Sequence, residues 1–182
     1  TSLPLVAGEK QSSSPVMKDM ISPMENTVYF LPNSDARQSQ IYFYIPMGDY
    51  NREENVRREA FNQYISGGFS GLIMNEIREK NSMAYTAYGF ASSRGLPGAQ
   101  TYFSGYIGTQ NDKAVDAIDL YMKLLTDMPE RPGRIDNIKS YLRQSALTDH
   151  PDSRNLSLRI AEWKRRGYTD DPAKEELPLI DS

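Results

Sequence analysis

The sequence predicts an α+β fold, a two-layer α/β sandwich in which an antiparallel-rich sheet carries its helices mainly on one face. Short runs rich in aromatic and β-branched residues come early in the chain, and helical spacing dominates after residue 112. The order of elements is a strand pair, a helix, a hairpin and further helices with short connections, which is typical of this class. A chain of 182 residues, 38% of them hydrophobic, is long enough for one core.

Residues 1–25 predict a linker or extended arm, because Gly, Ser and three prolines interrupt any regular period. We therefore expect one domain over residues 26–182. Its first strand is expected at 27–30, closed by turn residues, and its second at 40–46. Residues 41–45 are apolar or aromatic at every position, which places the second strand in the interior of the sheet.

Helical signals follow. Asn51 is a cap candidate ahead of a helix that ends at Gly67-Gly68, and a shorter helix is expected over residues 70–80. A hairpin comes next, with strands at 84–91 and 100–107 separated by Gly and Pro residues.

Three more helices are expected toward the end of the chain. The first spans about residues 112–128, the second begins near Pro132, and the third runs from about Ser153 to Gly167. Beyond these three helices, residues 170–182 are acidic, are interrupted by two prolines and show no recognisable stop.

Composition excludes several kinds of chemistry. Lys and Arg number 21 against 24 Asp and Glu without a long run of either sign, so nothing predicts a nucleic-acid partner. No apolar stretch approaches the roughly 20 residues of a membrane-spanning helix, so no membrane partner is expected. The absence of Cys excludes disulfides and a cysteine nucleophile but leaves the compartment open.

No metal site is expected in this chain. His150 is its single histidine, whereas a helical zinc site needs two imidazoles on one face, and no Cys can substitute. His150 lies in Asp149-His150-Pro151, where an exposed loop histidine is the expectation.

The stretch 69–85, FSGLIMNEIREKNSMAY, resembles the most recognisable block of the insulinase/pitrilysin zinc metallopeptidases. In that family a Gly-rich loop leads into a helix ending in an Arg-Glu-Lys-like run, followed by a small residue and a Tyr. Here the run is Ile77-Arg78-Glu79-Lys80 and the later pair is Ala84-Tyr85, while Asn81-Ser82-Met83 replaces a turn that often contains Gly or Leu. The resemblance covers roughly residues 27–170 and implies the fold of the mitochondrial processing peptidase.

The resemblance also implies a division of labour. One domain of these peptidases carries an inverted H-x-x-E-H zinc motif, and a non-catalytic partner domain supplies an Arg and a Tyr, seven residues apart, to the substrate. Arg78 and Tyr85 have that separation, so we expect them to bind an extended peptide, with Gly67, Gly68 and Phe69 beside its channel. No residue of this chain alone is expected to be catalytic, and the zinc is expected in the H-x-x-E-H domain of the same or another polypeptide.

Alternative interpretations stay open. Core subunits of respiratory complexes resemble this fold without proteolysis, which allows a structural or assembly role, and a stand-alone peptide-binding module is a third interpretation. For the glycines, helix termination is an equally good explanation. By resemblance we also expect a peptidase-family domain truncated at its C-terminus, and exported relatives are compatible with an extracytoplasmic, periplasmic setting.

Overall fold

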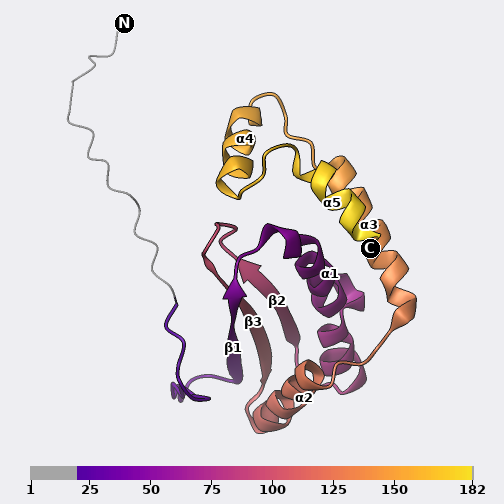
Figure 1. Ribbon diagram of the computed structural model, residues 1–182. Helices are drawn as coiled ribbons and strands as arrows, with labels where there is room; N and C mark the ends of the chain where they lie inside the picture. The colour runs from indigo at the N-terminus through magenta and orange to yellow at the C-terminus, as the bar shows by residue number, and fades with distance from the viewer. Residues whose placement is uncertain (1–19, 182) are drawn as a thin grey trace, which may run out of the picture.

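The computed structural model describes residues 20–181 and contains a sheet of three antiparallel strands with helices packed on one side (Figure 1). The strands are β1 (Gln38–Asp49), β2 (Thr86–Ser93) and β3 (Gln100–Gln110), in the order β1-β3-β2. The α-helices are α1 (Asn55–Ser66), α2 (Ala114–Thr126), α3 (Ile135–Thr148), α4 (Leu156–Arg165) and α5 (Pro172–Ile180). The predicted α+β class is confirmed.

Shorter helical segments connect these elements. A π-helix, η3 (Met74–Lys80), follows α1 and leads toward the hairpin. The remaining segments are 3-10 turns, namely η1 (Arg52–Glu54), η2 (Gly68–Ser70), η4 (Asn111–Lys113) and η5 (Pro132–Arg134). No helix formed by residues 20–181 combines the length and the apolar character needed to cross a membrane.

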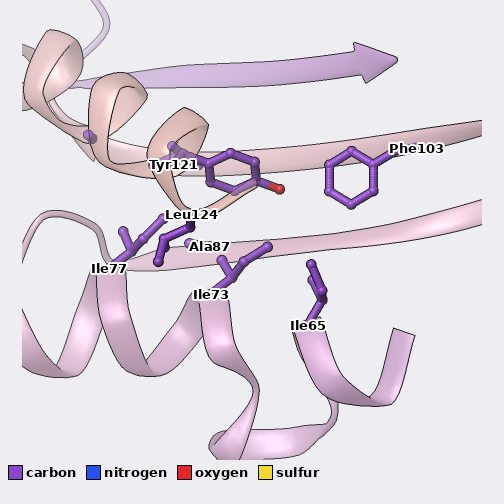
Figure 2. Packing of buried hydrophobic residues seen from close by; sticks show 9 residues of the cluster. Ile65, Ile73, Ile77, Ala87, Phe103, Tyr121 and Leu124 are labelled. Carbon is purple, nitrogen blue, oxygen red and sulfur yellow. The ribbon is translucent and has the colours of Figure 1, made fainter. Parts of the chain in front are cut away.

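The core lies between the helix-covered face of the sheet and the elements α1, η3 and α2 (Figure 2). Tyr121 on α2 is fully buried at its centre, and its ring stacks on Phe43 with ring centroids 4.3 Å apart. Its hydroxyl donates to the carbonyl oxygen of Tyr88 at 2.9 Å. Burial raises the pKa of the Tyr121 hydroxyl well above its ordinary value, so the group keeps its proton in the folded protein.

Two predictions about the strands are wrong. Residues 27–30 form no strand, and Val28, Tyr29 and Phe30 are 82–92% exposed, because no strand of the described chain pairs with them. The strand predicted for the sheet interior, β1, lies at an edge, and the central strand is β3. The aromatic residues of this run caused the error. Tyr42 is 70% exposed on the sheet face without helices, so an aromatic side chain at this position does not indicate a buried strand.

The other elements follow the prediction with shifted ends. The hairpin is β2 and β3, the helix expected at 112–128 is η4 with α2, and Gly167 ends the α4 segment with a φ of 92°. A further helix, α5, follows the three that were expected at the end of the chain, because Asp171 caps it and Pro172 occupies its first turn. Of the expected arm, residues 1–19 lie outside the described residues, and residues 20–25 form no helix or strand.

Candidate functional site

Arg78 lies near the end of the π-helix η3 and points its side chain toward solvent, with 45% of it exposed. Its Nε lies 3.6 Å from Oε1 of Glu79, a loose contact between two exposed groups. The weak pairing leaves most of the guanidinium N–H groups available to a ligand. π-Helical turns are rare and frequently occur at functional sites, which is consistent with a role for this segment.

Tyr85 lies immediately before β2 and is 53% exposed. Its backbone N–H donates to the carbonyl oxygen of Gly108 on β3 at 2.9 Å, which holds the residue against the sheet. Its hydroxyl oxygen accepts a hydrogen bond from Nε2 of Gln110 at 3.0 Å. Because the oxygen acts as the acceptor in that bond, the phenolic hydrogen is left to donate elsewhere.

The turn between Arg78 and Tyr85 is fixed by backbone hydrogen bonds. The N–H of Ser82 donates to the carbonyl oxygen of Arg78 at 3.0 Å, and the N–H of Met83 donates to that of Ile77 at 2.9 Å. Ser82 has a φ of 51°, the left-handed conformation that glycine adopts most readily. Asn81-Ser82-Met83, which replaces a turn that often contains Gly or Leu, therefore includes a serine in a backbone conformation that favours glycine.

The structure does not join Arg78 and Tyr85 directly. No hydrogen bond or ion pair connects the two side chains within residues 20–181. An apolar cavity of about 580 Å³ lies between α1, α3 and α5, but its lining includes neither residue. Their convergence on one peptide stays a prediction.

The glycine turn after α1 has a structural explanation. The N–H of Gly67 donates to the carbonyl oxygen of Gln63 at 2.9 Å and ends the helix, while Gly68 has a φ of 57°. The side chain of Phe69 lies outside the part of the structure that is described. Substrate contact by Gly67, Gly68 and Phe69 stays a prediction.

The residues present do not fit a zinc site. His150 is exposed in the loop after α3, and its backbone N–H donates to the carbonyl oxygen of Thr148 at 2.8 Å. Within residues 20–181 no group of three or more His, Asp or Glu side chains is arranged to hold a metal ion.

Sequence reasoning missed a row of aromatic rings on the sheet face that carries no helices. Tyr42, Tyr106 and Tyr88 are direct cross-strand partners on β1, β3 and β2, and we call them the tyrosine row. Ring centroids are 5.1 Å apart for Tyr42 and Tyr106 and 5.2 Å apart for Tyr106 and Tyr88. The recurrence of aromatic residues at even positions of all three strands was the signal for this row.

Fold and site together define an α+β domain that presents an exposed Arg and an exposed Tyr on either side of a helix-to-strand turn. The family model for the peptidase M16 inactive domain matches residues 10–133, more than half of the chain. The chain therefore belongs to the peptidase M16 family, as an inactive domain of that family. No curated protein matches it.

Several solved structures share this fold. The peptidase M16 inactive domain from Pseudomonas fluorescens aligns with a TM-score of 0.58 and 16% identity, over 79% of this chain and 35% of that chain. The inactive peptidase domain of a candidate zinc protease from Bordetella parapertussis aligns with a TM-score of 0.57 and 12% identity, over 80% and 79%.

A protease from Helicobacter pylori aligns with a TM-score of 0.56 and 13% identity, over 82% of this chain and 39% of that chain. Identities this low show the fold alone. The chain spans little more than a third of the length of the Pseudomonas and Helicobacter chains.

Proposed function

We propose that this chain is a substrate-binding, non-catalytic domain of a zinc metalloendopeptidase. In this proposal Arg78 and Tyr85 contact the peptide, and an H-x-x-E-H domain of the same or another polypeptide holds the zinc. The observation that carries the proposal is that both side chains are exposed, 45% and 53%, on either side of one hydrogen-bonded turn inside the region of the family match.

Tyr85 is suited to stabilise negative charge. Peptide hydrolysis passes through a tetrahedral intermediate whose oxygen gains negative charge, and a phenolic O–H can donate to that oxygen. Gln110 already donates to the Tyr85 oxygen at 3.0 Å, which orients the phenol and leaves its proton available. The sheet position of Tyr85, held through Gly108, supplies the rigidity that such a contact needs.

Arg78 is suited to hold the peptide. A guanidinium is always charged and presents several N–H donors in a fixed fork, which matches backbone carbonyls or a carboxylate of the substrate. Its neighbour Glu79 lies 3.6 Å away and is itself 54% exposed, so the pairing is weak enough to yield to a ligand. Neither Arg78 nor Tyr85 is a general base, so the chain alone is expected to be inactive.

The test is hydrolysis of a quenched fluorescent peptide by the complete peptidase that contains this domain and its zinc-binding partner. Tyr85→Phe is expected to lower kcat about 100-fold, the size of effect seen when one oxyanion donor is lost. Arg78→Ala is expected to raise KM about tenfold, since it removes one charged contact. Tyr29→Phe and Arg57→Ala are matched controls on exposed residues outside the site.

Unchanged kcat and KM in both site variants would remove the assigned roles. If the complete protein is also inactive with natural residues at both positions, the structural or assembly interpretation is the better one.

A further inference from the structure

The sheet face without helices carries no charged side chain over the paired parts of its three strands. Cross-strand pairing places the even-numbered residues of β1, β2 and β3 together on this face, opposite the residues that face the core. These residues are Gln38, Gln40, Tyr42, Tyr44, Pro46, Thr86, Tyr88, Phe90, Ser92, Tyr102, Ser104, Tyr106, Gly108 and Gln110. Charged residues make up 25% of the whole chain, so their absence here is distinctive. Depletion of charge with enrichment in Tyr is the composition of the core of a binding interface.

Aromatic rings cover the middle of this face. The tyrosine row crosses all three strands, and the ring of Phe90 stacks on that of Tyr88 with centroids 6.1 Å apart. Beside the row, the rings of Tyr44 and Tyr102 lie 5.6 Å apart. Tyr88 and Phe90 are each 38% exposed, so parts of their rings are accessible to a ligand. Aromatic rings in this arrangement can stack against a further aromatic group.

The tyrosine row is continuous with the Tyr85 site. Gln110, whose Nε2 donates to the Tyr85 hydroxyl at 3.0 Å, is an even-numbered residue of β3 and lies on the face that carries the row. Gly108 lies between Gln110 and Tyr106, and a Cβ atom at Gly108 would be 2.9 Å from the Tyr106 hydroxyl. The ring of Tyr106 therefore extends over Gly108 toward Gln110. No side chain of β3 separates the row from the residue that holds the Tyr85 hydroxyl.

The spacing along β3 gives the distance between the two features. Tyr106 and Gln110 are four positions apart on this strand. A strand rises about 3.3 Å per residue, so the two positions are separated by about 13 Å. A peptide in an extended conformation covers that distance in about four residues. A side chain about four residues from a carbonyl held at Tyr85 therefore lies over the row.

We propose that the tyrosine row is a subsite for an aromatic side chain of the peptide substrate, about four residues from the cleaved bond. In this subsite the substrate ring stacks on Tyr88 and Tyr106, the members of the row on β2 and β3. The inference rests on the proposed function, because it assigns the class of peptide that the Tyr85 site receives. An acidic side chain is disfavoured there, since ring faces carry partial negative charge and the strands offer no cation on this face to pair with it.

The first experiment measures kcat/KM of the complete peptidase, with its zinc-binding partner, on quenched fluorescent peptides. Each peptide carries a single tyrosine at a different position in a background of alanine and serine, and mass spectrometry locates the cut. We expect the cut to move with the tyrosine and to stay about four residues from it. Replacement of that tyrosine by alanine is expected to lower kcat/KM about fivefold, as for one aromatic pair, and replacement by glutamate is expected to lower it further.

Substitution of Tyr88 tests the same contact from the side of the protein. Tyr88→Thr removes the ring and keeps a residue suited to a strand. It is expected to lower kcat/KM about fivefold on the tyrosine peptide and to leave that on the alanine peptide unchanged. Tyr88→Phe keeps the ring and is expected to retain the preference for tyrosine. Tyr29→Thr, at an exposed position outside the sheet, is the matched control.

Cross-linking locates the substrate ring without a variant and without catalysis. A benzophenone amino acid replaces the tyrosine of the peptide, and the complete protein is irradiated with it in the presence of a chelator that prevents cleavage. Cross-links are expected within residues 86–90 of β2 and residues 104–108 of β3. An excess of the tyrosine peptide should suppress them, and an excess of the alanine peptide should suppress them less.

Three results would overturn the inference: a cut whose position is independent of the tyrosine, faster cleavage with arginine than with tyrosine at that position, or cross-links that avoid the sheet face because another domain covers it. The proposed function is judged separately by Arg78→Ala and Tyr85→Phe on the alanine peptide. If those variants lose activity while the position of the tyrosine has no effect, only the subsite assignment fails. If the complete protein cleaves no peptide, the proposed function fails, and cross-linking alone decides whether this face binds an aromatic side chain.

Discussion

A Cβ atom added to Gly105 would lie 2.2 Å from the hydroxyl oxygen of Tyr121, so the sheet accepts this buried ring only because Gly105 has no side chain. Gly89, the cross-strand partner of Gly105, stands in the same relation, since its Cβ would lie 2.4 Å from that oxygen. The absence of a side chain at these two paired positions lets Tyr121 of α2 pack directly against the backbone of the sheet. Any larger residue at either position must displace the ring or the strand.

Gly105→Ala is therefore expected to lower the free energy of unfolding by about 1–3 kcal/mol, the usual cost of overpacking a core. Gly133→Ala is the matched control, because a Cβ there meets no atom within 4 Å. Urea denaturation followed by circular dichroism measures both. Equal midpoints for the two variants would contradict the packing argument.

Stability is expected to fall at alkaline pH. Burial raises the pKa of Tyr121, and burial together with a 2.6 Å hydrogen bond to Oε1 of Glu176 raises the pKa of Tyr168. In the unfolded chain both phenols lose their protons near the ordinary tyrosine pKa of about 10. In the folded chain they keep their protons to higher pH. The stabilisation that these two phenols contribute is therefore complete below about pH 10. It is lost as the pH rises toward their pKa values in the folded protein.

Substitution tests the origin of this fall. The double variant Tyr121→Phe, Tyr168→Phe is expected to be less stable at neutral pH, by about 1 kcal/mol for each lost hydrogen bond. The gap to the natural chain should narrow as the pH rises above about 10, because the variant lacks the titrating groups. A gap of constant size between neutral and alkaline pH would show that other groups cause the fall. Tyr29→Phe, at an exposed position, should follow the natural chain.

The turn that separates Arg78 from Tyr85 carries backbone strain at Ser82, whose φ is 51°. Ser82→Gly is expected to raise the free energy of unfolding by about 0.5 kcal/mol, since relief of the left-handed conformation exceeds the added entropy of the unfolded chain. Ser140→Gly, on the exposed side of α3, should lower it by a similar amount through helix propensity alone. Thermal denaturation measures both variants. If Ser82→Gly and Ser140→Gly change the melting temperature in the same direction, Ser82 does not carry the proposed strain.

The side chain of Asn62 on α1 bonds both backbone groups of Ala91 on the outer edge of β2, and these contacts should matter for stability. Asn62→Ala leaves both backbone groups of Ala91 without their partner, and we expect a loss of about 1–3 kcal/mol. Asn137→Ala on the exposed face of α3 is the control and should change stability little. Amide hydrogen exchange of Ala91 should accelerate in Asn62→Ala. Unchanged exchange would mean that α1 does not protect this edge.

The sequence by itself determined the class of fold, the hairpin, the positions of most helices and the family block. These features depend mainly on local chemistry: Gly67-Gly68 favours the end of a helix, and Gly and Pro between two β-rich runs favour a turn. The sequence also predicted Arg78 and Tyr85 as site residues, because the block at residues 69–85 resembles the family.

Only the tertiary structure decided which strand is central and which edge the side chains of α1 cover. The run at residues 41–45 is apolar throughout, so its pattern cannot distinguish a strand covered on both faces from an edge strand with tyrosines on a bare face. That distinction depends on which strands pair, and pairing joins residues far apart in the chain, such as Tyr42 and Tyr106. The closure of β2 by Asn62 is likewise a long-range contact, and no spacing of residues along the chain encodes it.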